Sequence, residues 1–180
     1  IVLTSTRRVG KTTIQYQMID RLLKKGVPPQ KILFVSMDHP MLKLSGLNDL
    51  LECYHSNVYA EQDCYYFFDE IQYASDWDKW MKTIYDMQPE TKMVATGSAS
   101  PALMKGSSES GAGRWSVIQV PTLSFYEYCA LIGARVPELG PEIRPTAFLH
   151  MAQQERTAVM IKLEEVQNYF MRYLRVGGFP

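Results

Sequence analysis

Short apolar runs alternate with longer amphipathic stretches over most of the chain. The apolar runs are bounded by charged, small or turn-forming residues and predict strands at Ile1–Thr4, Lys31–Met37, Tyr65–Phe68, Met93–Thr96 and Val117–Val120. Between these runs, apolar residues at helical spacing predict helices at Thr12–Lys25, Leu47–Tyr54 and Trp77–Asp86. Strands separated by helices indicate an α/β fold, in which helices cover both faces of a parallel sheet of about five strands.

The final part of the chain has a different pattern. Residues 135–145 are rich in Pro and Gly without a clear period, and an apolar helical stripe follows them. The stripe consists of Val159, Leu163, Val166, Phe170 and Leu174 and ends at Gly177-Gly178. We therefore expect a core over residues 1–138 and, over residues 139–180, a linker with the start of a helical lid or C-terminal domain. The sequence begins inside a predicted strand and stops in a predicted turn, so we expect a piece of a longer protein.

The composition narrows the classes of partner. Hydrophobic residues make up 46% of the 180 residues, and the 19 basic and 19 acidic side chains give a net charge of zero. This balance argues against a general attraction to nucleic acid or to an anionic membrane, and no apolar run approaches the ~20 residues of a membrane span. The three cysteines are far apart and lack metal-binding spacing, so we expect reduced thiols in a cytoplasmic protein.

A phosphate-binding pattern follows the first predicted strand. It matches the loop G-x-x-x-x-G-K-[ST], except that Ser5 stands at the first glycine. Backbone N–H groups of such a loop and of the following helical turn converge on one point, where the helix dipole favours an anion. Lys11 would reach the β- and γ-phosphates of ATP, and the Thr12 hydroxyl would coordinate Mg²⁺. The predicted nucleotide-binding residues are Ser5, Thr6, Arg7, Arg8, Val9, Gly10, Lys11, Thr12 and Thr13.

Two adjacent acids follow the apolar run at Tyr65–Phe68. Asp69, at the tip of a buried strand, would hold Mg²⁺ opposite Thr12. Glu70 would point to the other side of the strand end and take a proton from the water that attacks the γ-phosphate. This pair is typical of nucleotide hydrolases of the additional-strand branch, whereas small-molecule kinases seldom carry it. The alternative is an acidic strand end that caps the next helix.

A Thr96-Gly97-Ser98 turn follows the fourth predicted strand. In the additional-strand branch this strand inserts between the strand before the phosphate loop and the strand before the acids. The hydroxyl of Thr96 or Ser98 would then lie beside the γ-phosphate and orient the attacking water. The alternative is a turn in which these hydroxyls bond to the local backbone.

Several further motifs occur in the same order as in a known family. They are TRRVGKTT, ILFVSMD, YYFFDEIQ, the helix W-x-x-x-M-K-x-x-Y-D, VATGSAS, Gly113-Arg114, LSFYEY and LRVGGFP. The chain thus resembles the ATPase domain of a widespread prokaryotic group in the AAA superfamily, in which a C-terminal domain of unknown function usually follows. The resemblance implies a three-layer P-loop fold of the AAA-like branch, with ATP and Mg²⁺ as cofactors. It also implies the C-terminal domain as an intramolecular partner, with a protein partner or self-association as a further option.

The same resemblance assigns roles to single residues. It supports Lys11 and Thr12 as phosphate and metal contacts, and it makes Arg114 match an arginine that follows the sensor and would swing towards the developing phosphoryl charge. A plain surface arginine is the alternative. Pro180 matches a G-x-P turn that meets the adenine base, and a helix C-cap followed by a turn is the alternative there.

The resemblance implies ATP binding and Mg²⁺-dependent hydrolysis coupled to an adjoining domain. A nucleotide-gated interaction module that binds ATP with little or no turnover is the alternative, and a nucleic-acid motor is a third option that the composition does not favour. Ser5 bears on this choice, because the family pattern begins its loop with Gly-Pro and this chain has Ser5-Thr6. If the first position requires a positive φ, Ser5 is strained and affinity falls; if the backbone is ordinary there, nothing is lost.

Overall fold

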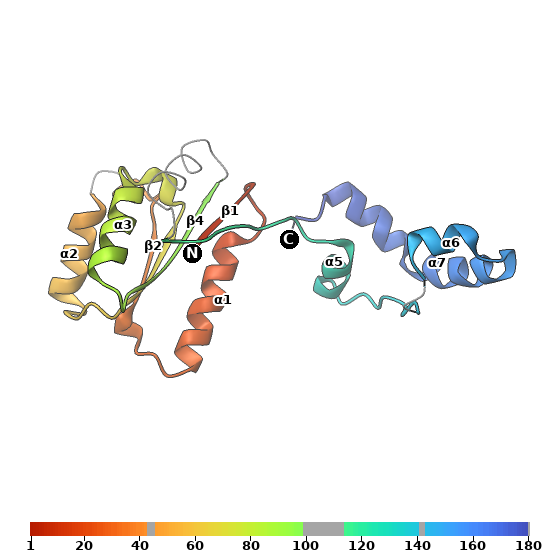
Figure 1. Cartoon of the computed structure of the whole chain (residues 1–180), viewed down its shortest axis with the longest axis horizontal. Coiled ribbons are helices and arrows are strands. Elements are labelled where there is room, and N and C mark those ends of the chain that lie inside the picture. Colours follow the sequence, from red (N-terminus) through yellow and green to blue (C-terminus); the bar gives the residue numbers. More distant parts are fainter. Residues whose placement is uncertain (43–45, 99–113, 141–142, 180) are drawn as a thin grey trace. The chain divides into compact units, whose positions relative to one another are not determined.

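The computed structural model describes residues 1–42, 46–98, 114–140 and 143–179. The chain divides into two compact units, Ile1–Pro121 and Thr122–Pro180. Unit 1 contains β1 (Val2–Ser5), α1 (Lys11–Lys24), the 3-10 turn η1 (Pro29–Lys31), β2 (Ile32–Ser36), α2 (Leu47–Asn57), β3 (Tyr65–Asp69), the 3-10 turn η2 (Ile71–Tyr73), α3 (Trp77–Met87), β4 (Lys92–Ser98) and β5 (Val117–Gln119). Unit 2 contains α5 (Phe125–Leu131), α6 (Pro145–His150) and α7 (Gln153–Val176) (Figure 1).

The five strands of unit 1 form one parallel sheet in the order β2-β3-β4-β1-β5. This confirms the predicted α/β fold, including the insertion of β4 between the strand before the phosphate loop and the strand before the acids. The register pairs Ser5 with Ser98 and Ser36 with Asp69, so these polar residues share the carboxyl edge of the sheet. Ligands of open parallel sheets bind at that edge.

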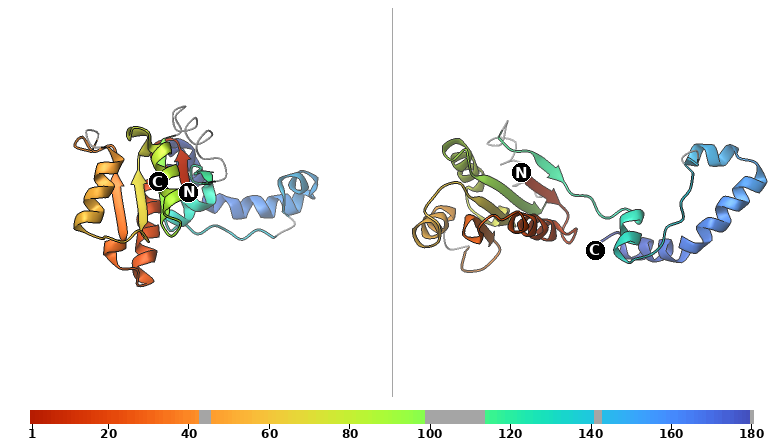
Figure 2. Two further views of the ribbon diagram at one scale, coloured as in Figure 1. Left: turned by 60° about the vertical axis from the view of Figure 1, so that its left-hand side comes forward. Right: turned by 90° about the horizontal axis from the view of Figure 1, so that it is seen from below.

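Helices cover both faces of the sheet, as Figures 1 and 2 show from three directions. Leu3, Phe67 and Val94 are buried on the α1 side, and α2 and α3 cover the other face. Neighbouring residues of β3 therefore enter two different cores, since successive side chains of a strand point to opposite faces. This explains why the run at Tyr65–Phe68 is continuously apolar rather than alternating.

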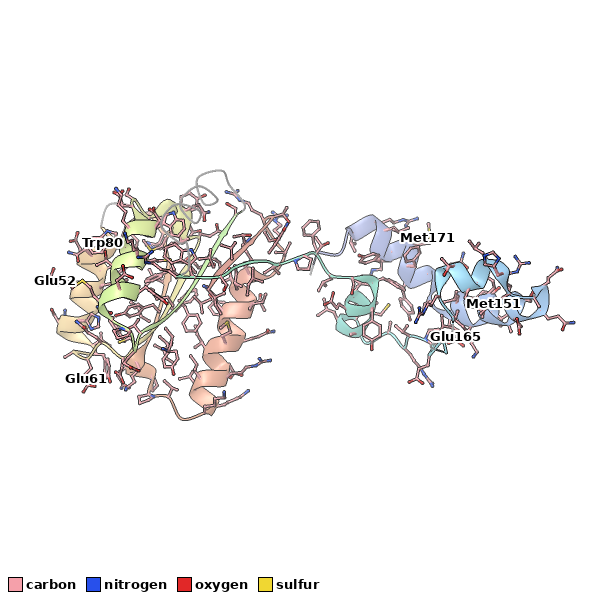
Figure 3. The ribbon with its side chains drawn as sticks, viewed as in Figure 1. Glu52, Glu61, Trp80, Met151, Glu165 and Met171 are labelled. Atoms are coloured by element: carbon pink, nitrogen blue, oxygen red, sulfur yellow. The ribbon has the colours of Figure 1, made fainter. Side chains whose placement is uncertain are left out.

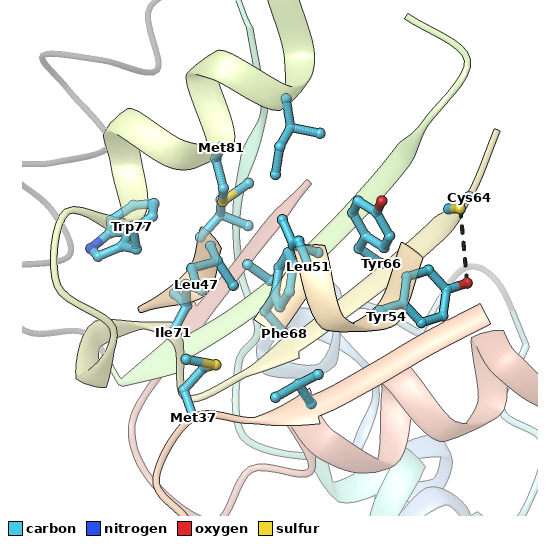
Figure 4. Packing of buried hydrophobic residues seen from close by; sticks show 14 residues of the cluster. Met37, Leu47, Leu51, Tyr54, Cys64, Tyr66, Phe68, Ile71, Trp77 and Met81 are labelled. Atoms are coloured by element: carbon cyan, nitrogen blue, oxygen red, sulfur yellow. Dashed lines mark hydrogen bonds between the residues drawn. The ribbon is translucent and has the colours of Figure 1, made fainter. Parts of the chain in front are cut away.

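The larger core lies between the sheet and the pair α2–α3 (Figure 4). Tyr66 and Phe68 of β3 are fully buried there, and Trp77 and Met81 of α3 pack over them. Full burial of an apolar side chain of this size stabilises the fold by about 1.5–3 kcal/mol. Trp80 of α3 adds to this core from its edge, whereas Glu52 of α2 projects from the outer side of its helix (Figure 3).

The strand ends differ from the predicted ones by a few residues. β1 continues to Ser5 and β4 continues to Ser98, so both serines belong to paired strands rather than to the turns in which the sequence placed them. Hydrogen bonding between the strands determines these ends. The pattern of apolar residues does not mark them, because the last residues of these strands are polar. α1 and α3 lie where they were predicted, within one residue at each end.

Unit 2 begins earlier than the boundary predicted near residue 140. α5 packs on α7, with the rings of Phe125 and Phe170 centred 5.1 Å apart and those of Tyr128 and Tyr173 centred 5.5 Å apart. These contacts join residues 122–131 to the C-terminal helix. No helix in the described part of the chain is both long and apolar enough to cross a membrane.

Candidate functional site

The loop between β1 and α1 ends at a helix N-terminus that is open to an anion. Gly10 is the N-cap of α1 with φ 89°, and its carbonyl accepts the first helical hydrogen bond from Ile14 N at 3.0 Å. No side chain caps α1, and its first turn contains no acidic residue. The first N–H groups of α1 thus keep the arrangement that binds phosphates at helix N-termini.

The backbone conformation of this loop shows whether Ser5 is strained at the first loop position. Ser5 is buried and extended as the last residue of β1, where it pairs with Ser98 of β4. Besides Gly10, the residue with a positive φ in the loop is Arg8, at 67°. Serine is therefore unstrained at the first loop position, and the sequence pattern gave no indication that Arg8 would adopt a conformation usually left to glycine.

Lys11 is the first residue of α1 and is only 5% exposed. Its Nζ donates to the Thr6 carbonyl oxygen at 2.9 Å, so the ammonium group lies against the backbone of its own loop. Val9 is buried, while Arg7, Arg8 and Thr13 are exposed. The loop thus has one buried cation that its own backbone holds and two exposed cations.

Thr12 and Asp69 are in direct contact. Thr12 Oγ1 donates to Asp69 Oδ2 at 2.9 Å, and Thr96 Oγ1 donates to Asp69 Oδ1. Mg²⁺ binds oxygen ligands and usually takes one or two protein carboxylates, the rest of its shell coming from water and substrate phosphates. A threonine hydroxyl and a carboxylate beside an anion-binding helix N-terminus fit that donor set. The described residues contain no group of three or more His, Cys, Asp and Glu side chains that would hold a metal ion without such help.

Glu70 follows β3 in a left-handed conformation, with φ 51° and ψ 47°. Its N–H donates to Thr96 Oγ1 at 3.1 Å, so one buried hydroxyl fixes both acids, Asp69 by its side chain and Glu70 by its backbone. Thr96 is fully buried, whereas Ser98, at the tip of β4, is partly exposed. The geometry therefore gives Thr96 a role in holding the acids and leaves Ser98 nearer to the surface of the site.

Two glutamines also contact residues of the site or of the strands that carry them. Gln72 Nε2 donates to Glu70 Oε2 at 2.5 Å and to Ser98 Oγ at 3.1 Å. Gln15 of α1 is fully buried, and its Nε2 donates to the carbonyl oxygens of Phe68 at 3.2 Å and Val94 at 3.3 Å. Gln15 is a polar residue on the buried side of a predicted helix, and this pattern could have indicated a buried polar contact.

The structure does not bring Arg114 to the other predicted site residues. Arg114 comes shortly before β5, and its Nε and Nη2 donate to the two carboxylate oxygens of Asp86 on α3, at 3.0 and 3.3 Å. It lines a cavity of about 680 Å³ together with Ile1, Tyr65 and Lys92, which lie at the amino ends of their strands. Lys11 and Asp69 lie at the opposite edge of the sheet. Pro180 lies outside the described residues.

Comparisons with known proteins agree with the fold. The family model described as "AAA domain" matches residues 1–129. Two uncharacterized proteins of Methanocaldococcus jannaschii are 30% and 25% identical over 100% and 99% of the chain, and an uncharacterized protein of Haemophilus influenzae is 28% identical over 99%. The chain spans 38%, 35% and 39% of the lengths of these relatives.

Two solved structures share the fold over 73% of the chain, each with a TM-score of 0.50. One is Hsp104 of Saccharomyces cerevisiae in complex with ADP, which is 18% identical and of which 21% is covered. The other is the ORC1 protein of Aeropyrum pernix in complex with DNA, which is 13% identical and of which 42% is covered. At these identities the likeness concerns the fold.

Proposed function

Because the chain belongs to the AAA domain family, we propose that it binds ATP together with Mg²⁺ and hydrolyses the bond to the γ-phosphate. The observation that carries this proposal is the contact between Thr12 and Asp69 at 2.9 Å, beside the open N-terminus of α1. It joins the phosphate loop to the acid pair at one edge of one sheet. A nucleotide is also the ligand in the Hsp104–ADP structure, which has the same fold.

Binding would use the loop backbone and two side chains. The N–H groups at the start of α1 would receive the phosphates, and Lys11 Nζ would exchange its bond to the Thr6 carbonyl for phosphate oxygens. Thr12 and Asp69 would hold Mg²⁺, which neutralises charge on the β- and γ-phosphate oxygens when it is bound. Because Ser5 is extended within β1, we expect normal affinity in spite of the missing glycine.

Hydrolysis would use Glu70 as the general base. Its carboxylate would take a proton from water as the water oxygen bonds to the γ-phosphorus and the bond from that phosphorus to the bridging oxygen of ADP breaks. Ser98, at the tip of the neighbouring strand, would contact the γ-phosphate or the attacking water. Thr96 would hold Asp69 and the Glu70 backbone in place.

Arg114 lies apart from these residues in the structure. It is ion-paired with Asp86 and lies towards the amino edge of the sheet, so a role in hydrolysis requires a rearrangement of this segment or a second copy of the chain. Coupling of the nucleotide cycle to an adjoining domain remains part of the proposal. It is supported by the length of the relatives, of which this chain spans less than half.

The test is phosphate release by the purified protein in the presence of MgATP. We expect Glu70→Gln to lower the rate by about 10²–10³-fold and to leave ATP binding within about threefold, because the base acts on water rather than on the bound nucleotide. Lys11→Ala should lose binding and turnover together. Equal rates for the wild-type protein and Glu70→Gln would remove Glu70 from this role, and tight binding without turnover by the wild type would favour the interaction-module alternative.

A further inference from the structure

Gln72 connects the general base to the tip of β4. Its Nε2 lies 2.5 Å from Glu70 Oε2 and 3.1 Å from Ser98 Oγ. Building on the proposed hydrolysis, we propose that Gln72 is a positioning residue: its amide nitrogen holds the Glu70 carboxylate beside Ser98, and its Oε1 accepts a hydrogen bond from the attacking water.

The backbone that carries Gln72 is fixed by its neighbours. Ile71 is fully buried in the core under α3, and the η2 turn closes through hydrogen bonds from Tyr73 N to Glu70 O at 3.1 Å and from Ala74 N to Ile71 O at 2.9 Å. Arg7 of the phosphate loop donates to Tyr73 Oη of the same turn at 3.2 Å. Gln72 therefore extends from a turn whose backbone is held in place, and this turn sets the position from which its side chain reaches Glu70.

The chemistry of the two partners fixes the orientation of the Gln72 amide. An ionised carboxylate only accepts hydrogen bonds, so the NH₂ group of Gln72 must face Glu70, and the reverse orientation would place two acceptors against each other. The second N–H of the same nitrogen is given to Ser98 Oγ. Since that oxygen accepts from Gln72, the Ser98 proton points towards a different acceptor, and a γ-phosphate oxygen at the tip of β4 would be one.

The amide oxygen of Gln72 requires a hydrogen-bond donor. Gln72 Oε1 is buried, and it has no hydrogen-bond partner among the described residues. Buried acceptors are nearly always satisfied by protein or by ordered water. A water on Oε1 would lie next to Glu70, because both groups belong to the same small cluster. That is the position required of the water from which Glu70 takes a proton.

The experiment compares Gln72→Met with the wild type. Methionine keeps the length of the side chain but neither donates nor accepts a strong hydrogen bond. We expect kcat for phosphate release to fall about 10- to 100-fold, because a misplaced base and water lose that much, while the dissociation constant for ATP changes less than threefold. Gln62→Met is the matched control, since Gln62 is exposed at the other end of β3, and it should behave like the wild type.

A double variant separates positioning from a general structural effect. The water that Gln72 holds is the one from which Glu70 takes a proton, so placing it matters little once the base is gone. Adding Gln72→Met to Glu70→Gln should therefore change the slow single-turnover rate less than threefold. An independent role would lower that rate again by the full factor, and this result would overturn the proposal. So would a wild-type rate for Gln72→Met, or a parallel loss of ATP affinity and thermal stability.

Gln72→Asn gives a second route to the same answer. It keeps the amide but shortens its reach, so we expect the same direction of change in kcat as for Gln72→Met. A wild-type rate for this variant would overturn the proposal even if Gln72→Met failed to fold. All of these outcomes presuppose an active wild type; phosphate release no faster than that of Lys11→Ala would instead reject the proposed hydrolysis, and the role of Gln72 with it.

Discussion

Thr12 Oγ1 donates to Asp69 Oδ2 across 2.9 Å, which joins the first turn of α1 to the last residue of β3. Thr12 lies on the helix that follows β1 and Asp69 ends β3, and these two strands are not neighbours, because β4 lies between them. The contact therefore spans β4 and depends on α1 lying across the sheet. Thr96 of β4 donates to the other oxygen of Asp69, so a helix and a strand both bind the carboxylate that β3 carries.

The first prediction concerns the charge of this carboxylate. Asp69→Asn keeps an oxygen that can accept from Thr12 but removes the negative charge that would attract Mg²⁺. We expect affinity for MgATP to fall about 10- to 100-fold, as for other groups that orient or hold a metal, with little change in binding measured in EDTA. Titration of a fluorescent ATP analogue under both conditions checks this. Asp63→Asn, at the other end of β3, is the control; equal affinities for wild type and Asp69→Asn in Mg²⁺ would contradict the prediction.

The second prediction concerns the first position of the phosphate loop. Ser5 is extended and paired in β1, so Ser5→Gly should not improve ATP binding. It should instead lower the free energy of unfolding by about 0.5–1 kcal/mol, because glycine in a strand loses more conformational entropy on folding. Calorimetric titration with ATP and urea unfolding measure the two effects. A tenfold gain in affinity would show that serine impairs the site.

The third prediction concerns Arg8, whose φ is 67°. Arg8→Val should lower the free energy of unfolding by about 1–3 kcal/mol, because a β-branched residue is strained at positive φ. Arg8→Gly removes the same charge and the same side chain without this strain, and we expect it to stay within about 1 kcal/mol of the wild type. Urea unfolding of the pair isolates the backbone effect, and equal losses for the two variants would show that the arginine side chain matters instead.

The fold and the centre of the site could be predicted because both depend on periodic patterns. Continuous apolar runs such as Tyr65–Phe68 indicate strands that are covered on both faces. Parallel strands place their carboxyl ends at one edge, so Lys11, Thr12 and Asp69 could be expected together once the loop and the acids each followed a strand. The structure brings these three residues to one edge, and their chemical roles stay predictions.

The remaining parts depend on features that have no periodic pattern. Gln72 reaches Glu70 and Ser98 because Glu70 turns the chain with φ 51°. A glutamate in the sequence gives no indication of this left-handed conformation. Unit 2 starts at Thr122, before the boundary expected near residue 140, and the capping box of Ser124 and Glu127 is the helix signal that the sequence offers there. Arg114 was predicted from its place after the sensor in the sequence, but strand direction carries it towards the amino edge.

The fourth prediction is a pH dependence at the amino end of β3. The hydrogen bond from Lys31 lowers the pKa of Asp63, and the same bond raises the pKa of Lys31. The stabilisation is therefore complete above the unfolded pKa of Asp, about 3.9, and is lost as the pH falls through the lower folded value. Lys31 behaves in the opposite sense, with stability lost only as the pH rises above about 10.4.

Between these limits the contribution of the pair should be constant. We expect Asp63→Asn to lower the midpoint of thermal unfolding slightly at neutral pH, since both side chains are partly exposed. The difference from the wild type should begin to shrink below about pH 3.9 and should vanish once the pH has fallen through the lowered pKa of the folded state, where the carboxylate is protonated in both states. Melting curves from pH 3 to pH 9 test this. A difference that stays constant down to the lowest pH would mean that packing, and not charge, explains the effect.

The last prediction concerns Gly178, the residue before Phe179 in the C-terminal motif. A Cβ at Gly178 would lie 2.5 Å from the Leu123 carbonyl oxygen, and φ there is 67°. Gly133, also in unit 2, has a φ of 68° but no described atom within 4 Å of its Cβ position. Gly133→Ala should therefore cost only the strain of a left-handed alanine, about 1–2 kcal/mol, whereas Gly178→Ala adds a backbone clash and should cost about 2–4 kcal/mol.

Hydrogen exchange locates this effect. Leu123 N donates to the Gly178 carbonyl oxygen at 2.8 Å, and Tyr173 Oη donates to the Leu123 carbonyl oxygen at 2.8 Å, so the start and the end of unit 2 are tied together at one place. Gly178→Ala must separate these segments, and we expect the Leu123 amide to lose protection in that variant and to keep it in Gly133→Ala. Equal protection in both variants would show that the clash is relieved by a small local shift, and that the glycine is needed at this position for its φ alone.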